Sequence, residues 1–289
     1  MAVTLERPGS LWTLVLAAVA FAGVGGALLA YFTAPDGQAA GSAAAGGSEE
    51  KIRVPLFVDP NQVRPTPRFR FTFDPPEALA ELRSSEALDS VVQGAEGDDL
   101  RTGLELMHWA RRRWEPGRPS PYPPIDARII LRDIRRGFTG GFCAQYNYVL
   151  AQALQSFGIP ARYVSLIEHE VIEIFLRDER RWVCLDPLYD TYYTDEDGRP
   201  LSVHAIHSSL GTERRVLLSS PALVKDLDSH LGSFRAFAVW LKNDHVSAPL
   251  NFTDLERYKV YFLSDQPASR HIPAGALATS EPLDLYPEG

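Results

Sequence analysis

The segment from 140 to 160 most constrains what this chain can fold into. Apolar residues recur at helical spacing after Cys143, which predicts an amphipathic helix from Cys143 to Phe157. These residues are Tyr146, Val149, Leu150, Leu154 and Phe157. Gly158 favours the left-handed backbone that follows a helix end, and Pro160 prevents the helix from continuing. Cys143 therefore opens the helix.

This position favours a reactive thiol. A thiol at a helix N-terminus lies near the positive end of the helix dipole, which favours the nucleophilic thiolate. Gly140 and Gly141 allow the backbone to turn sharply and a substrate carbonyl to approach closely. The backbone N–H of Cys143 would then donate to an oxyanion, and Trp114 and Tyr122 are candidates for the second donor.

Three strands are predicted after the helix, because β-branched and aromatic residues alternate there between turn signals. Their ranges are 161–167, 169–175 and 181–186. A hairpin between the last two would bring His169 opposite Asp186, although the sequence leaves the register open. His169 would then be the general base and acid for Cys143, and Asp186 would orient its imidazole ring.

Four motifs follow one another in a fixed order. They are Gly141-Phe142-Cys143 at a helix start, Gly158-Ile-Pro-Ala-Arg162, His169 before an alternating strand with Glu173, and Trp182-Val-Cys-Leu-Asp-Pro187. Together they resemble the transglutaminase-like superfamily, over about a third of the chain. The resemblance implies a Cys143 nucleophile, a His169 base and an orienting Asp186. It also implies an α+β, papain-like fold with the nucleophile helix packed on an antiparallel β-sheet.

The resemblance implies thiol-dependent acyl transfer through a thioester on Cys143. Water would complete peptide or amide hydrolysis, and an amine would complete transamidation. A protein or peptide is the expected substrate, and the chemistry requires no cofactor. A catalytically inactive binding or scaffold module of the cell envelope stays open as the alternative, since this superfamily also includes members without known activity.

The N-terminal residues predict a membrane segment. Residues Leu11 to Phe32 carry no charge, and about 20 such residues can cross a bilayer as a helix. An uncleaved anchor is favoured because the run exceeds the roughly 7 to 15 apolar residues of a signal peptide, although a cleaved signal stays open. Arg7 favours a cytoplasmic N-terminus. The catalytic domain would then be periplasmic or extracellular, and secreted if the segment is cleaved.

Composition changes divide the rest of the chain. The predicted parts are an anchor or signal (1–32), a Gly/Ala/Ser linker (33–50), an N-terminal extension (51–98), a transglutaminase-like core (99–195) and a C-terminal extension (196–289). The last extension is either further sheet or a small accessory domain. Its end, 267–289, is rich in proline and predicts a loosely packed tail.

The sequence also bears on a disulfide, a metal site, a nucleic-acid partner and an acidic cluster. A disulfide between Cys143 and Cys184 stays open, because paired cysteines are common in exported proteins. His204 and His207 have a spacing that could hold a metal, but no carboxylate or cysteine completes a set, so no metal site is predicted. The net charge of −8 disfavours a nucleic-acid partner. The glutamates at 168, 170 and 173 predict a solvated or groove-lining acidic cluster.

Overall fold

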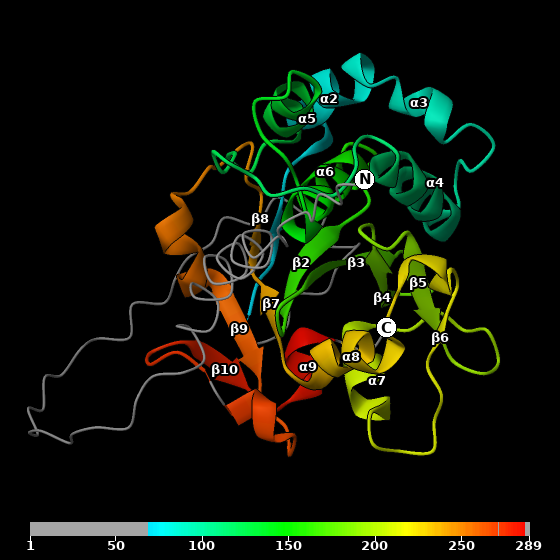
Figure 1. Cartoon of the computed structure of the whole chain (residues 1–289), viewed down its shortest axis with the longest axis vertical. Helices are drawn as coiled ribbons and strands as arrows, with labels where there is room; N and C mark the ends of the chain where they lie inside the picture. Colours follow the sequence, from blue (N-terminus) through cyan, green and yellow to red (C-terminus); the bar gives the residue numbers. More distant parts are fainter. Residues whose placement is uncertain (1–68, 271, 287–289) are drawn as a thin grey trace, which may run out of the picture. The chain divides into compact units, whose positions relative to one another are not determined.

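The computed structural model describes residues 69–270 and 272–286, and in this part the chain is an α+β fold (Figure 1). Its described residues form an eight-stranded sheet and a second, two-stranded one of β1 (Thr72–Phe73) and β8 (Lys242–Asn243). The large sheet runs in the order β10 (Leu277–Thr279), β9 (Lys259–Phe262), β7 (Phe237–Trp240), β2 (Ala161–Leu166), β3 (Glu170–Leu176), β4 (Arg181–Asp186), β5 (Thr191–Thr194) and β6 (Leu217–Leu218).

The large sheet is mixed, so the expectation of an antiparallel sheet is wrong. Its strands pair antiparallel from β9 through β6, but β10 pairs with β9 in parallel, with Leu277 opposite Val260. A parallel neighbour needs a connection much longer than a hairpin turn, because the chain must return to the starting edge. Residues 263–276 form that connection.

Helices lie on both faces of the large sheet (Figure 1). α6 (Cys143–Gln155) packs on β2 and β3 and is flanked by α4 (Asp99–Arg111) and α5 (Ala127–Arg135). α2 (Ala80–Ser85) and α3 (Leu88–Val91) complete this layer. The other face carries α7 (Val203–Ser209), α8 (Leu227–Gly232) and α9 (Pro282–Leu285). The sheet therefore separates two hydrophobic cores.

Strand alternation assigns side chains to the two cores. In β3, Ile172 and Ile174 join the core under α6, whereas Val171 and Phe175 join the core on the opposite face. β4 repeats this pattern, because successive side chains of a strand point to opposite faces. Cys184 belongs to the face away from α6.

The predicted start of the helix at Cys143 is confirmed, but the helix ends at Gln155, two residues before the predicted Phe157, and it is not amphipathic. α6 begins at Cys143, and Gly158 has the left-handed φ of 71° expected beyond a helix end. Every residue of α6 is buried, since the sheet and the neighbouring helices surround it. Its buried Gln152 is satisfied within the protein, because it accepts from Ala127 N at 2.8 Å and donates to Ile125 O at 3.1 Å.

The C-terminal residues are part of the fold, so the prediction of a loosely packed tail is wrong for 267–270 and 272–286. Leu285 of α9 is fully buried, and its carbonyl oxygen accepts from Arg162 Nη1 at 2.7 Å. Arg162 is itself fully buried and forms an ion pair with Glu173. Glu173 therefore does not belong to a solvated acidic cluster, whereas Glu168 is exposed.

The expected fold also included an N-terminal membrane helix, which the described residues do not contain. Among residues 69–270 and 272–286, no helix is long and apolar enough to cross a membrane. The predicted segment Leu11–Phe32 and the linker 33–50 lie outside the described residues. The extracytoplasmic location stays a prediction.

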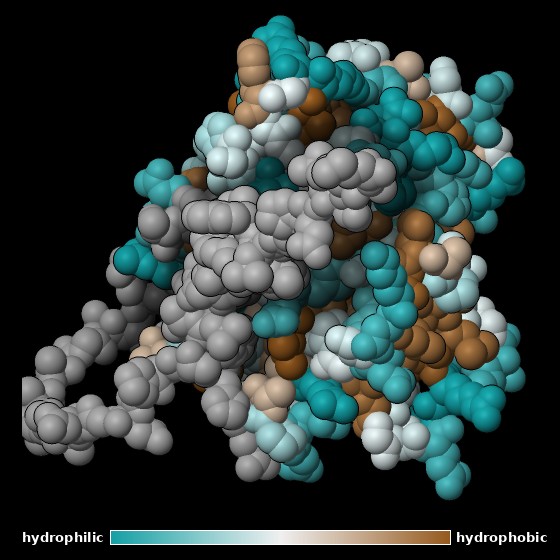
Figure 2. Space-filling view, viewed as in Figure 1, coloured by the Kyte–Doolittle hydropathy of each residue, from teal (hydrophilic) through white to brown (hydrophobic). Residues whose placement is uncertain are grey.

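Exposed apolar side chains gather before α8. Leu217, Leu223 and Leu227 are 45%, 42% and 45% exposed, and they precede or begin the helix that carries His230. Figure 2 shows apolar surface in the region of β5 and β6. This stretch therefore offers apolar surface beside the elements that form the site described below.

Candidate active site

Cys143 is fixed at the N-terminus of α6 by the loop that precedes it. Gly141 O accepts from Gly117 N at 2.8 Å and from Trp114 Nε1 at 3.2 Å. Phe142 N donates to the side-chain oxygen of Gln145 at 3.1 Å, which satisfies a donor at the helix start. Cys143 is 7% exposed. As the first helical residue it has a backbone N–H without an intrahelical acceptor.

The two glycines before Cys143 are required by close packing. A Cβ on Gly140 would lie 2.7 Å from Arg118 O, and one on Gly141 would lie 2.8 Å from Trp114 Nε1. Neither glycine has the positive φ found at Gly137 and Gly158. The loop therefore reaches Cys143 through a space that only glycine fits, rather than through a left-handed turn.

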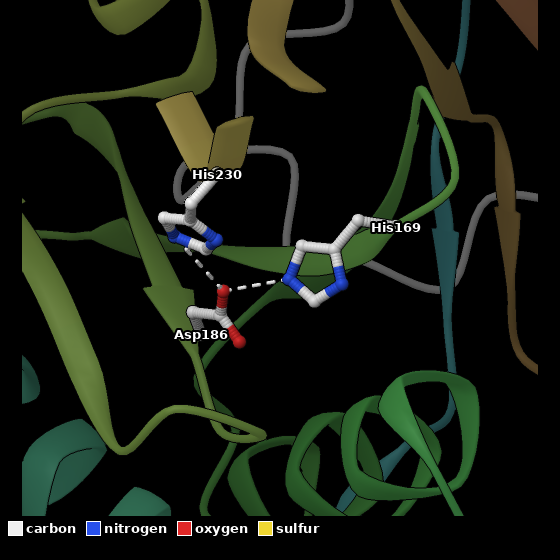
Figure 3. A group of neighbouring side chains, drawn as sticks. All are labelled: His169, Asp186 and His230. Carbon is white, nitrogen blue, oxygen red and sulfur yellow. Dashed lines mark hydrogen bonds and ion pairs between the residues drawn. The ribbon is translucent and has the colours of Figure 1, made fainter. Parts of the chain in front are cut away.

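His169 lies one residue before β3, and its ring points to the carboxylate of Asp186 (Figure 3). Its Nε2 is 2.7 Å from Asp186 Oδ2, and the Cys143 side chain lies close enough to raise the pKa of His169. Because Nε2 is occupied by Asp186, Nδ1 is the ring nitrogen left to exchange a proton with Cys143. The structure therefore brings together all three residues that the sequence singled out.

Charge around His169 favours its protonated form. Burial alone would lower the pKa of His169, but the Asp186 carboxylate and the hydrogen bonds to Asp186 and Cys143 outweigh it and raise the pKa well above its ordinary value. His169 is thus suited to hold a proton taken from the Cys143 thiol at neutral pH.

Asp186 is the last residue of β4 and is fully buried. Its Oδ2 also accepts from Tyr193 Oη at 3.1 Å, and Oδ1 accepts from Tyr189 N at 3.4 Å. Donors on both oxygens hold the carboxylate in one orientation.

Tyr193 and His230 were not singled out from the sequence. Tyr193 Oη lies 2.7 Å from His230 Nε2, and that nitrogen lies 3.8 Å from Asp186 Oδ2. His230 comes from α8, far along the chain from β4, with no motif around it. Tyr193 lies on β5, and its period-two alternation with Thr191 was the one signal that it faces inward.

The possible disulfide does not form in the structure. Cys143 and Cys184 are both free. Cys184 is fully buried in the core on the face of the sheet away from α6, and burial raises its pKa well above the ordinary value. It is an unreactive apolar residue of that core.

The two candidates for a second oxyanion donor have different surroundings. Trp114 stacks on Tyr146 with ring centroids 4.1 Å apart, and its Nε1 is bonded to Gly141 O. Tyr122 lies within electrostatic reach of Cys143, with its hydroxyl beside Gln145 and Tyr148. The residue is 43% exposed, but burial at its hydroxyl end raises its pKa, so it keeps its proton at neutral pH. Tyr122 is the better donor.

One group in the described part of the chain could hold a metal ion. The nearest side-chain atoms of His169, Asp186 and His230 lie within 4.8 Å of one another. These atoms already hydrogen-bond each other or Tyr193, so a metal would have to displace that network. The pair considered from sequence is engaged too, because both ring nitrogens of His207 bond to Phe234 O and Ser264 Oγ.

Comparison with known proteins finds no matching family model, curated protein or solved structure. The resemblance to the transglutaminase-like superfamily rests on the motifs alone and stays a prediction.

Proposed function

We propose that this protein catalyses thiol-dependent acyl transfer through a thioester on Cys143. The observation that carries the proposal is the position of His169, which bonds Asp186 Oδ2 through Nε2 at 2.7 Å and has the Cys143 side chain beside it. A base that is oriented by a buried acid and lies beside a thiol is the arrangement that nucleophilic catalysis requires. The motif resemblance to the transglutaminase-like superfamily supports the same chemistry.

The proposed reaction has two steps, formation of the thioester and its breakdown. In the first, His169 Nδ1 takes the thiol proton and Sγ of Cys143 attacks the acyl carbonyl carbon, giving a tetrahedral oxyanion. As this intermediate collapses, the bond to the amine leaving group breaks and His169 returns the proton to the amine. In the second step, His169 takes a proton from water or an amine, which attacks the thioester and releases the Cys143 thiolate.

The oxyanion needs donors beside Cys143. The N–H of Cys143 at the start of α6 is one, and the protonated Tyr122 hydroxyl is the proposed second. Both come from segments that meet at the N-terminus of α6. The substrate class is a protein or peptide carboxamide, with hydrolysis or transamidation set by the acceptor that enters.

Alkylation of the full-length protein tests the proposal. Iodoacetamide should label Cys143 rapidly at pH 6 to 7, below the pH near 8.5 at which an ordinary thiol ionises. Cys184 is the internal control, because it is buried and should stay unlabelled. His169→Ala should abolish the low-pH labelling, whereas His108→Ala, which removes a surface His–Asp pair with Asp190, should not.

The acyl step is tested with p-nitrophenyl acetate as probe. The expected result is an acetyl group on Cys143, seen by mass spectrometry after acid quenching and absent in Cys143→Ser. A protein that gains no acetyl group and labels at Cys143 only as an ordinary thiol would contradict the proposal and leave the binding-module alternative.

A further inference from the structure

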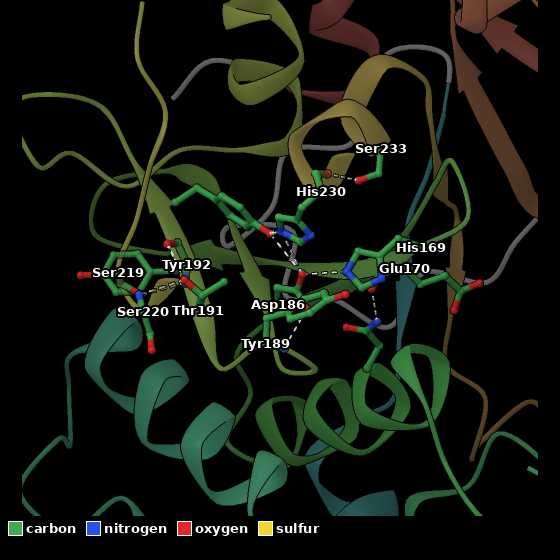
Figure 4. A network of polar contacts seen from close by, with 12 residues as sticks. His169, Glu170, Asp186, Tyr189, Thr191, Tyr192, Ser219, Ser220, His230 and Ser233 are labelled. Atoms are coloured by element: carbon green, nitrogen blue, oxygen red, sulfur yellow. Dashed lines mark hydrogen bonds and ion pairs between the residues drawn. The ribbon is translucent and has the colours of Figure 1, made fainter. Parts of the chain in front are cut away.

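Two residues that the proposed steps do not use, Tyr193 and His230, are linked to Asp186 by hydrogen bonds. Tyr193 Oη lies 3.1 Å from Asp186 Oδ2 and 2.7 Å from His230 Nε2 (Figure 4 shows His230 and Asp186 in this network). The Tyr193 and His230 rings stack at 5.9 Å between centroids. Tyr193 is fully buried and His230 is 9% exposed, so water does not replace these contacts.

The direction of these hydrogen bonds follows from donor counting. Tyr193 has one proton and two short contacts, and Asp186 can only accept. If Tyr193 donated to His230, two acceptor oxygens would face each other at 3.1 Å in a buried site, which is costly. The arrangement that satisfies every atom is His230 Nε2–H to Tyr193 Oη and Tyr193 O–H to Asp186 Oδ2. His230 is then neutral, as its burial requires, because burial lowers its pKa.

We infer that His230 and Tyr193 form a hydrogen-bond chain onto Asp186 that takes up part of the charge on Oδ2 and so limits how firmly His169 holds its proton. Both are positioning residues, because they act through Asp186. The inference rests on the proposed function, in which His169 must both take a proton from Cys143 and release it to the leaving group. A base that is too strong would do the first step and impede the second.

The other groups beside His169 do not supply the hydrogen bond that Tyr193 donates to Asp186 Oδ2. Cys143 comes from α6 and Glu170 from β3, while Tyr189 packs its ring 5.6 Å from the imidazole. Neither Tyr189 nor Glu170 gives Asp186 Oδ2 a side-chain donor; the amide of Tyr189 bonds the other oxygen. Tyr193 is thus the second donor to the oxygen of Asp186 that His169 binds.

NMR titration of the His169 ring in the full-length protein tests the inference. In Tyr193→Phe, Asp186 Oδ2 loses its second donor and keeps more charge for His169, so His169 should titrate about 0.5 to 1 pH unit higher. His230→Leu should raise it by less, and His230→Gln, which keeps an N–H donor, should restore the original value. The double variant should shift it no further than Tyr193→Phe alone, because one chain is broken.

The matched control is Tyr286→Phe, which removes a hydroxyl that bonds the buried carboxylate of Glu173 at 3.1 Å. It should leave the His169 titration unchanged. No shift or a downward shift in Tyr193→Phe, an additive double variant, or an equal shift in Tyr286→Phe would each overturn the inference. Alkylation of Cys143 in the unchanged protein decides the proposed function separately, since the His169 titration does not depend on the thiol reacting.

Discussion

His169 and Asp186 are not paired across the hairpin that joins them. β3 and β4 pair Ile172 with Leu185 and Glu173 with Cys184, so the same register continued by one step places Val171 opposite Asp186. His169 lies two residues further on, and its ring returns to Asp186 Oδ2 at 2.7 Å. Glu168, with a left-handed φ of 54°, turns the backbone immediately before it. The base is therefore held on a loop end, and its partner on a strand.

Removing the Asp186 carboxylate should change the rate and its pH dependence together. In Asp186→Asn the imidazole loses its charged partner, and the expected fall in kcat is roughly 10³- to 10⁴-fold. Because Asp186 raises the pKa of His169 and burial lowers it, the variant should lose the His169 proton at lower pH. The measurement is hydrolysis of p-nitrophenyl acetate across pH 5 to 10.

The matched control for this variant is Asp190→Asn. Asp190 bonds His108 Nδ1 at 2.6 Å in a partly exposed pair, and raises its pKa. Its loss should leave the rate and the pH profile of the probe reaction unchanged. A similar fall in both variants would show that Asp186 acts on stability and not on His169.

Tyr122→Phe should slow the acyl step with little effect on substrate binding. The hydroxyl is assigned to the oxyanion, and loss of one oxyanion donor costs about 10²- to 10³-fold in kcat. KM should change little, since the donor acts on charge that develops after binding. Tyr286→Phe again serves as the control for removing a buried hydroxyl. A decrease in kcat smaller than about threefold would mean that another group is the second oxyanion donor.

Glu173→Gln should destabilise the fold without touching the site. Arg162 donates to Glu173 through Nε at 2.9 Å and Nη2 at 2.7 Å, and both side chains are fully buried. Removing one charge of a buried pair leaves the other unpaired, which costs about 3 to 5 kcal/mol. Urea unfolding measures the loss. Glu179→Gln, which breaks an exposed pair with Arg181, should cost less than about 1 kcal/mol.

Local pattern explains which parts of the fold could be predicted. α6 and β4 follow from spacing and from turn residues next to them, so Cys143 and Asp186 were placed at the correct ends of their elements. Register depends on side-chain packing between strands, and the sequence does not contain it in readable form. His169 was therefore predicted near Asp186 but as the first residue of the strand, whereas it lies one residue before β3.

Contacts between distant segments explain what could not be predicted. His230 reaches Asp186 because its ring bonds and stacks on Tyr193 of β5, and no local pattern marks that contact. Leu285 was assigned to a loose tail by its proline-rich surroundings, but its carbonyl is the partner of the buried Arg162. A buried arginine from β2 thus orders a segment that its own composition leaves undefined.

Gly140→Ala tests whether the loop before Cys143 is set by packing. The added Cβ would lie 2.7 Å from Arg118 O and 2.9 Å from Gly117 C, which are backbone atoms that cannot rotate away. The loop must then shift, so low-pH labelling of Cys143 should be lost and the protein should be destabilised by about 1 to 3 kcal/mol. Gly117→Ala is the matched control from the other side of the same contact. Its Cβ meets nothing closer than Glu115 O at 3.9 Å, and its N–H to Gly141 O is kept. Equal labelling in Gly140→Ala and Gly117→Ala would mean that the close approach of 117–118 to Gly140 does not position Cys143.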